Sequence, residues 1–371
     1  MLRTPFAPRN FASDDDAAAI EVCGYAAPLE VVGFEQEYLA VRSGVSLYDF
    51  SMLHKFDVRG PGALAAVDAM VVRDLTKVRP GRIAYGPVVD DDGLMIDDST
   101  CMILSPEHVR VTGGAGLPAA VETCLTGTPG VTIDAFRERV FQLNVQGPRS
   151  RELLGRLSPA DLSNEAFPYY TVREHVSIAG VDCFVARMGF TGELGFELWG
   201  PADRALDVWD ALVETGADIG VCGAGALTVL TVRTESGMIM GDGLDYGPST
   251  SPWECTLGWT VSPTKRGYRG SAALLAAQHT APNRVVTVRL DADPPGDATM
   301  SPLAVVDGDE IGHLNLTVPS PFAGSTLAMS TVRKDCAEVG TRVVARFEGA
   351  DLRGEIVPTP LYDPERRRVR S

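Results

Sequence analysis

The sequence predicts an α+β protein that ends in a separate β-barrel domain. Amphipathic helical stretches alternate with antiparallel strand pairs through the first part of the chain, which is typical of an α+β architecture. Beyond a predicted linker at residues 280–283, short β runs follow one another between Gly and Pro turns, and this spacing indicates a small barrel. We therefore expect two interleaved α+β subdomains within residues 1–280 and a β-barrel within residues 281–371.

The elements of the first unit follow from periodicity and turn residues. Amphipathic stretches predict helices at residues 35–43, 61–71, 149–157 and 202–215. Apolar runs predict strands at residues 45–50, 56–58, 109–111, 143–146 and 181–186, and a hairpin over residues 82–104. Residues 226–236 fit either a helix or a strand, and residues 1–27 are expected to form a loose lead-in with one short helix at 17–22.

The elements of the barrel are predicted in the same way. Its strands are expected at residues 284–290, 303–306, 311–318, 341–347 and 352–357. The arginine-rich end, residues 366–370, is expected to be a solvated tail.

Composition narrows the class of partner. The 371 residues carry a formal charge of −16, which argues against nucleic acid or an anionic membrane and favours a small-molecule ligand. The seven cysteines include no C-x-x-C pair, so we expect reduced thiols, a cytoplasmic location and no metal site. No apolar run approaches the roughly 20 residues needed to span a bilayer.

A glycine-rich stretch at residues 187–197, with the sequence RMGFTGELGFE, follows the predicted strand at 181–186. Its glycines indicate a turn in which the backbone closely approaches another group. Glu193 and Glu197 lie four residues apart, where desolvated carboxylates could accept hydrogen bonds from a ligand's NH groups. A surface hairpin with solvated acids is the alternative from this pattern alone.

A second glycine-rich segment requires a different comparison. The strand at residues 109–111 leads into Gly114, Gly116 and Ala119, with Asp134 further on, which is the spacing of a dinucleotide site. The strands before it form a hairpin and no second βαβ unit follows. This context disfavours nicotinamide binding.

Short motifs spread over residues 45–364 resemble, in order and spacing, the glycine-cleavage T-protein family of folate-dependent aminomethyltransferases and their demethylase relatives. The motifs are SLYDFS at 46–51, GRIAY at 81–85, GLMIDD at 93–98, QGP at 146–148, FTGELGFE at 190–197, YRG at 268–270 and LYDP at 361–364.

The resemblance implies a three-part cloverleaf around a central cavity for tetrahydrofolate. Asp97 is similar to the family's catalytic aspartate near the reacting folate nitrogens, and Glu197 to the glutamate that grips the pterin ring. Tyr85 is similar to a tyrosine that lines the folate cavity. A pterin presents NH donors along one edge, which buried carboxylates can meet with charge-assisted hydrogen bonds.

Other cofactor-binding positions follow from the same resemblance. Phe190 stands where the family has tyrosine, and Gly113 falls where it has asparagine. Arg233 and Glu235 match a pair in the family motif, and Glu254 lies where the family has a short acidic motif facing the cavity.

The segment at 225–237 also departs from the family pattern. Val229 and Leu230 stand where the family has an Arg-Asp pair, so one cation for folate or for a partner's carboxylate is missing.

These features predict an enzyme that transfers a one-carbon unit, most simply a methyl group, from a small N-, S- or O-methylated compound to tetrahydrofolate. The first alternative is a glycine-cleavage aminomethyltransferase that uses a lipoylated carrier protein. It is disfavoured because an acidic carrier would be repelled by a chain of charge −16. The second alternative is a non-catalytic folate-binding or regulatory protein.

Overall fold

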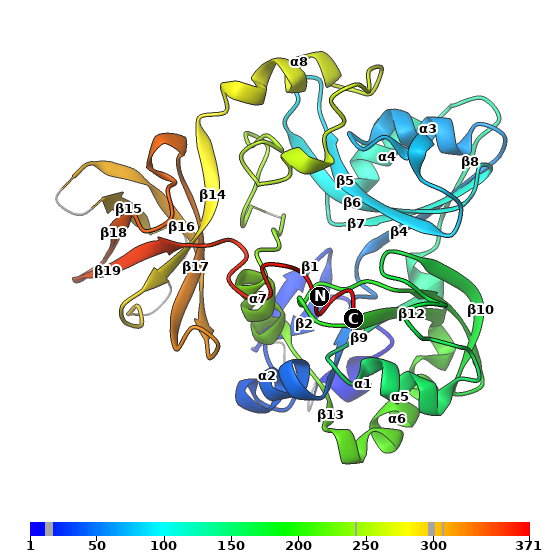
Figure 1. Ribbon diagram of the computed structural model, residues 1–371. Helices are drawn as coiled ribbons and strands as arrows, with labels where there is room; N and C mark the ends of the chain where they lie inside the picture. The colour runs from blue at the N-terminus through cyan, green and yellow to red at the C-terminus, as the bar shows by residue number, and fades with distance from the viewer. Residues whose placement is uncertain (12–17, 242, 296–300, 306–307) are drawn as a thin grey trace.

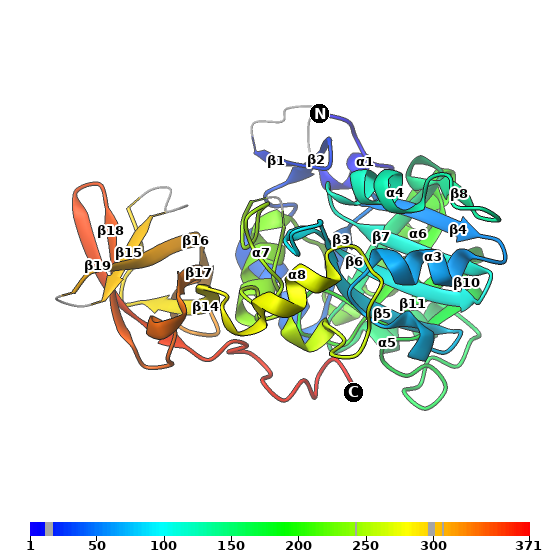
Figure 2. The same cartoon turned by 90° about the horizontal axis from the view of Figure 1, so that it is seen from above.

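A computed structural model describes residues 1–371 except 12–17, 242, 296–300 and 306–307. The chain forms three lobes: two are sheets covered by helices, and the third is a β-barrel that stands to one side (Figure 1). The view from above shows the same separation of the barrel from the two sheet lobes (Figure 2). The predicted α+β fold with a C-terminal barrel is confirmed.

The first lobe is a five-stranded sheet in which all neighbouring strands are antiparallel, in the order β5-β6-β7-β4-β8. Its strands are β4 (His54–Arg59), β5 (Arg82–Val89), β6 (Met95–Ser105), β7 (His108–Gly113) and β8 (Thr132–Ala135). Helices α3 (Ala63–Met70) and α4 (Leu117–Leu125) pack on one face, where Val67 and Leu117 meet Val58 in a buried core.

The second lobe is a six-stranded sheet in the order β10-β11-β12-β9-β3-β13, in which β13 runs parallel to β3. Its strands are β3 (Val45–Asp49), β9 (Val140–Gln146), β10 (Val172–Ile178), β11 (Val181–Ala186), β12 (Gly195–Pro201) and β13 (Val221–Gly223). Its helices are α1 (Ala7–Asn10), α2 (Phe34–Ser43), α5 (Ser150–Leu157), α6 (Ala205–Thr215) and α7 (Ala226–Glu235). The ambiguous stretch at 226–236 is therefore a helix.

The lead-in contains a hairpin rather than the predicted helix. Strand β1 (Ala19–Val22) pairs with β2 (Tyr25–Pro28), while residue 17 lies outside the described part of the chain. Cys23 and Gly24 take φ values of 50° and 87° between them. Two consecutive residues with positive φ form the tight turn that suits a two-residue hairpin loop, and this turn chemistry was not recognised from the sequence.

The third lobe is a closed barrel of the strands β14-β17-β16-β15-β18-β19. Its strands are β14 (Asn283–Leu290), β15 (Pro302–Val305), β16 (Glu310–Ser320), β17 (Ser325–Arg333), β18 (Arg342–Phe347) and β19 (Ala350–Val357). The sequence missed β17, in which the polar residues Thr326 and Ser330 are buried, and it missed α8 (Ser271–Ala276) before the barrel. Residue 306 of the predicted strand at 303–306 is not among those described.

Polar contacts tie α7 to the barrel. Glu235 accepts a hydrogen bond from Ser320 Oγ at 2.7 Å, and Asp245, which follows α7, accepts one from Asn315 Nδ2 at 3.2 Å. The boundary at residue 281 stays a prediction. None of the described helices is long and apolar enough to cross a membrane.

Candidate functional site

The two sheets, the β1–β2 hairpin and α7 enclose a cavity of about 500 Å³. Residues of β5, β6 and β7 contribute from the first sheet, and residues of β3, β9 and β12 contribute from the second. Residues after β19 close part of the wall. The cavity therefore lies where the lobes meet, and residues far apart in sequence share it.

Asp97 lies on β6, is only 3% exposed and lines this cavity. Its Oδ1 accepts hydrogen bonds from the backbone N–H groups of Asp98 at 2.7 Å and Gly114 at 3.2 Å, whereas its buried Oδ2 has no partner within the described structure. Burial, assisted by the charge of Asp98, raises the pKa of Asp97 to about 7. A carboxyl group near half-ionisation at neutral pH is suited to proton transfer.

Asp98, the neighbour of Asp97, is held by two tyrosine hydroxyl groups. Tyr85 donates to Asp98 Oδ2 at 2.8 Å, and Tyr246 donates to its Oδ1. The two hydroxyl groups hold the Asp98 carboxyl group beside Asp97, whose pKa the charge of Asp98 raises. Burial raises the pKa of both tyrosines.

Glu197 lies on β12 on the other side of the cavity and is 4% exposed. Gln142 Nε2, from the adjacent strand β9, donates to Glu197 Oε2 at 3.0 Å. Burial is the main cause that raises the pKa of Glu197 to about 7, while hydrogen bonds and the Lys55 ammonium oppose it. The free protein therefore holds this carboxyl group ready to ionise when a donor-rich ligand arrives.

Several cavity-lining polar atoms are buried and lack a partner within the described structure. They are Tyr48 Oη, Asp97 Oδ2, Thr112 Oγ1 and Gln142 Oε1. Buried polar atoms are normally hydrogen-bonded, so such a group of orphans indicates a polar ligand or ordered water. The unpaired oxygen of Gln142 beside Glu197 gives two acceptors together, which fits a ligand edge that presents several NH donors.

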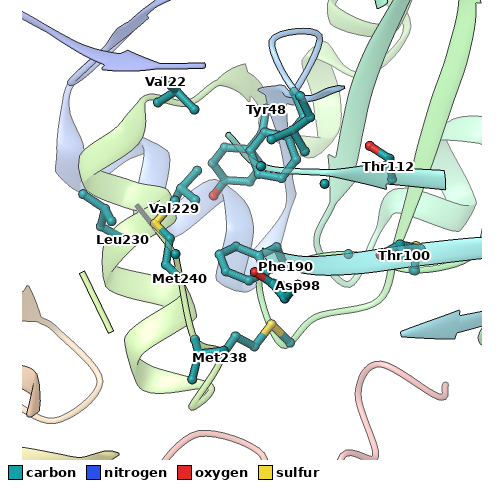
Figure 3. A pocket seen from close by; sticks show the side chains of 18 of the residues that line it. Val22, Tyr48, Asp98, Thr100, Thr112, Phe190, Val229, Leu230, Met238 and Met240 are labelled. Carbon is teal, nitrogen blue, oxygen red and sulfur yellow. The ribbon is translucent and has the colours of Figure 1, made fainter. Parts of the chain in front are cut away.

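One end of the cavity is apolar. Figure 3 shows Val229 and Leu230 of α7 on one wall with Val22, Met238 and Met240 close by. The rings of Tyr48 and Phe190 lie further in. Val229 and Leu230 thus face the cavity at the positions where the family motif has Arg and Asp.

Some of the predicted site residues line the cavity and others do not. Asp97, Glu197, Tyr85, Phe190 and Gly113 all line the one cavity.

Arg233 and Glu254 do not line the cavity. Arg233 is fully buried in an ion pair with Asp245, and Glu254 accepts hydrogen bonds from Ser251 N and Oγ at 2.9 and 3.1 Å. Direct contact of these two side chains with a cofactor, as the sequence predicted, does not match this placement. Both stabilise the segments that follow α7.

The glycines of residues 187–197 approach a side chain of the protein itself. A Cβ on Gly189 or Gly195 would lie 1.9 or 2.1 Å from Gln146 Oε1. The Gln146 amide donates to the carbonyl groups of Met188 at 3.1 Å and Phe196 at 3.4 Å. The predicted close approach is present, and its object is Gln146.

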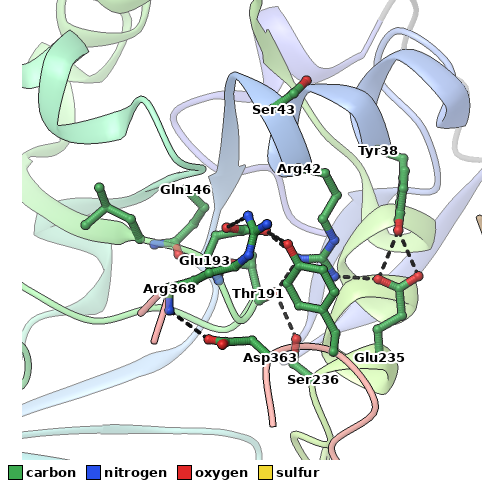
Figure 4. A network of polar contacts seen from close by, with 12 residues as sticks. Tyr38, Arg42, Ser43, Gln146, Thr191, Glu193, Glu235, Ser236, Asp363 and Arg368 are labelled. Atoms are coloured by element: carbon green, nitrogen blue, oxygen red, sulfur yellow. Dashed lines mark hydrogen bonds and ion pairs between the residues drawn. The ribbon is translucent and has the colours of Figure 1, made fainter. Parts of the chain in front are cut away.

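Glu193 does not face the cavity either. It accepts hydrogen bonds from Arg42 at 3.1 Å, from the Tyr362 hydroxyl and from Arg368 at 3.3 Å (Figure 4). Arg42 also pairs with Glu235, so this network joins α2, α7 and the end of the chain. The predicted ligand role of Glu193 is wrong because internal cations occupy its carboxylate.

The arginine-rich end is only partly the predicted solvated tail: Arg367, Arg368 and Arg370 are exposed, whereas Arg366 and Val369 are not. Figure 2 shows it running from the barrel back to the sheet lobes. Val369 is 5% exposed, and Arg366 is the one Lys or Arg side chain among the described residues that line the cavity. Sequence reasoning missed Arg366 because a run of arginines predicts a solvated segment, although Val369 within this run is buried.

Gln142 and Tyr246 were also missed. A signal for Gln142 existed, because Phe141, Leu143 and Val145 alternate with Gln142, Asn144 and Gln146 along β9. All six side chains are buried, so the polar face of the strand points into the protein. Tyr246 lies in a loop and carries no periodic signal.

The glycines that suggested a dinucleotide site form the cradle of Asp97. Strand β7 is antiparallel to both of its neighbours, β6 and β4, so no βαβ unit surrounds the turn. A Cβ on Gly116 would lie 2.2 Å from the carbonyl oxygen of Ile96. Gly116 therefore allows the turn to reach the strand that carries Asp97.

We expect Gly116→Ala to destabilise the protein by about 1–3 kcal/mol, because the new methyl group forces backbone to move. Gly155→Ala is the matched control: Gly155 lies in α5 with open space around its Cβ position, and the change should stabilise by roughly 0.5–1 kcal/mol. Guanidinium chloride unfolding midpoints measure both. Equal midpoints for the two variants would contradict the steric explanation.

Comparison with known proteins agrees with this arrangement. A family model for the GCVT N-terminal domain matches residues 10–265, and one for the glycine cleavage T-protein C-terminal barrel domain matches residues 283–363. A curated aminomethyltransferase from Herpetosiphon aurantiacus is 31% identical over 98% of both chains. Another, from Halothermothrix orenii, is 29% identical over 93% of this chain and 96% of its own.

A solved structure shows the same fold. The glycine cleavage system aminomethyltransferase T from Bartonella henselae matches with a TM-score of 0.85, at 23% identity, over 98% of both chains.

Proposed function

We propose, from the premise that this chain belongs to the glycine cleavage T-protein family, that it binds tetrahydrofolate in the main cavity and passes a one-carbon unit to it. The family is one of tetrahydrofolate-dependent one-carbon transferases, so the chain is an enzyme of that class. The expectation of a non-catalytic protein finds no support in relatives that are named for an activity.

One observation carries the folate assignment: two buried carboxyl groups, each with a pKa of about 7, line a single cavity from two different sheets. Two oxygen atoms at these groups have no partner within the described structure: Gln142 Oε1, which lies beside Glu197, and Oδ2 of Asp97 itself. Such a pair fits a ligand that has NH donors at one end and an amine that exchanges protons further along.

The residues take distinct roles in this proposal. Bound tetrahydrofolate supplies the amine nitrogen that accepts the one-carbon unit. Glu197 and Gln142 hold the pterin edge, and Asp97 holds or moves a proton beside the reacting nitrogens. Arg366 provides a cation for a carboxylate of the ligand. Much of the acceleration then comes from orientation within the cavity.

Two remaining wall residues help to shape the site. Phe190 supplies an aromatic wall, and Gly113 lines the cavity while the absence of its side chain allows close packing against Leu117.

The one-carbon donor is proposed to be an aminomethyl group on a lipoylated carrier protein. The relatives named aminomethyltransferase support this reading over the methylated small molecule that the sequence favoured. The charge of −16 then requires that the carrier dock on a locally cationic face.

A small methylated donor remains the second candidate on one observation. Val229 and Leu230 form an apolar wall of the cavity at the two positions where the family motif has Arg and Asp. A compact methylated compound would fill this end.

The cytoplasmic location stays a prediction that depends on the reduced cysteines.

Two measurements test the proposal. Isothermal titration with tetrahydrofolate should give saturable binding at one site per chain. Incubation with a lipoylated aminomethyl carrier should release ammonia and form 5,10-methylenetetrahydrofolate, whereas a methyl donor would give 5-methyltetrahydrofolate. Absence of folate binding would refute the assignment, and the product distinguishes the two donors.

A further inference from the structure

Tyr48 brings a buried hydroxyl group to the apolar end of the main cavity. The side chains at this end are those of Val22, Val229, Leu230, Met238 and Met240. Tyr48, on β3, is 1% exposed, lines the same cavity and belongs to one packed cluster with Val229. Figure 3 shows its hydroxyl oxygen on the side of Val229.

The Tyr48 hydroxyl has no hydrogen-bond partner among the described residues. Ser46, two residues earlier on β3, donates its own hydroxyl to the Glu37 carbonyl oxygen at 3.2 Å. The Glu37 carboxylate accepts from Gly225 N at 2.9 Å and from Thr228 Oγ1 at 2.8 Å. A buried hydroxyl group without a partner is costly, so this atom indicates a polar group on a ligand.

This hydroxyl keeps its proton and therefore acts as a hydrogen-bond donor. Burial raises the pKa of Tyr48 well above its ordinary value, because ionisation would place a phenolate in apolar surroundings. A protonated hydroxyl group stabilises a neighbouring atom on which negative charge develops. An amine that departs from an ammonium compound is neutral and gains no such charge. The apolar walls and this hydroxyl therefore suit a departing sulfur or oxygen atom.

We propose that the Tyr48 hydroxyl donates a hydrogen bond to the sulfur or oxygen atom from which the one-carbon unit departs. This inference rests on the proposed function, because it takes Asp97 as the group beside the accepting nitrogen. The nitrogen lone pair forms the new N–C bond, while the C–S or C–O bond breaks and its electron pair stays on the sulfur or oxygen. Asp97 takes the proton that the amine gives up. The donor is thus a thioether or an ether, whether a protein carries it or it is free.

The first test needs no turnover and uses 4-nitrophenol, whose phenolate reproduces a departing oxygen atom and whose ionisation is followed by absorbance. The ionisation constant of the bound probe should be about 10–100-fold lower in full-length Tyr48→Phe than in the wild type, because a hydrogen bond to a charged acceptor is lost. Tyr268→Phe is the matched control. Tyr268 is 3% exposed, its hydroxyl also lacks a partner within the described structure, and it lies outside the cavity wall. Each variant removes an atom without a partner, so both should keep the wild-type unfolding midpoint.

The second test identifies the source of the departing atom by turnover. With a lipoylated aminomethyl carrier the departing atom is sulfur, and with 4-nitroanisole, a methyl ether, it is oxygen. Tyr48→Phe should lower the turnover number about 10–100-fold for the donor that the enzyme uses, with little change in KM, because the hydrogen bond strengthens as charge develops. Tyr268→Phe should match the wild type.

Val229→Phe reports where the probe binds. Its larger side chain fills the apolar end and should weaken nitrophenol binding about tenfold. The proposal is overturned by a wild type that does not bind the probe, by an equal change in Tyr268→Phe, or by unchanged nitrophenol affinity in Val229→Phe. An unchanged ionisation constant or an unchanged turnover number in Tyr48→Phe also overturns it. The nitrophenol titration is made without folate, so failure of the wild type to bind tetrahydrofolate would refute the proposed function separately.

Discussion

Asp97→Asn is expected to lower the turnover number for one-carbon transfer by about 10²–10⁴-fold, the usual contribution of a positioned proton-transfer group. The amide keeps an oxygen that can accept from the Asp98 and Gly114 N–H groups, so the turn around it is preserved. It cannot exchange a proton at the oxygen that has no partner within the described structure. The measurement is the rate of methylenetetrahydrofolate and ammonia formation, with folate binding followed separately.

The dissociation constant for folate should change little in this variant, because the proposed pterin contacts lie at Glu197 and Gln142. Asp92→Asn is the matched control: Asp92 is exposed at the turn of the same hairpin and should retain full activity. An Asp97→Asn enzyme within a few-fold of wild-type turnover would remove Asp97 from the chemistry. A loss of activity that parallels a loss of folded protein would do the same.

The fold was predictable where periodicity and turn residues agree. Helix α2 and the hairpin β5–β6 combine a clear apolar pattern with a recognisable end or turn. The hairpin β1–β2 was not predicted because its turn depends on a positive φ at Cys23, and a cysteine residue does not indicate this backbone conformation. Strand β17 failed because its buried positions include serine and threonine, which pair by hydrogen bonds rather than through an apolar pattern.

The site was predictable only in part, for a related reason. Asp97 and Glu197 stand in motifs, and both face the cavity. Glu193 stands in the same motif as Glu197, yet four residues along the turn its carboxylate meets Arg42, which lies about 150 residues away in the chain. The local sequence shows that a carboxylate is present. Whether that carboxylate binds a ligand or forms an internal ion pair depends on residues that are distant in the sequence.

Glu197→Gln is expected to make the folate-free protein more stable at pH 8 by on the order of 3 kcal/mol. The folded-state pKa of Glu197, about 7, lies above the ordinary value of 4.5, so the folded state binds more protons than the unfolded state between these values. The stability that the wild type gains from this group is complete below pH 4.5 and is lost as the pH rises through 7. Glutamine has no charge to bury, so the advantage of the variant should grow over that same window.

The same substitution should weaken folate binding, because an ionised carboxylate accepts stronger hydrogen bonds from the pterin NH groups than an amide oxygen does. Wild-type affinity should therefore rise between pH 6 and 8 as Glu197 ionises, whereas the affinity of Glu197→Gln should stay flat. Thermal or denaturant unfolding gives the stability difference at each pH, and titration calorimetry gives the affinity. Glu338→Gln, an exposed glutamate, serves as control for both. Opposite signs for stability and binding at one residue are what a buried acid held for a ligand requires, and a variant that loses both would mark Glu197 as a structural group.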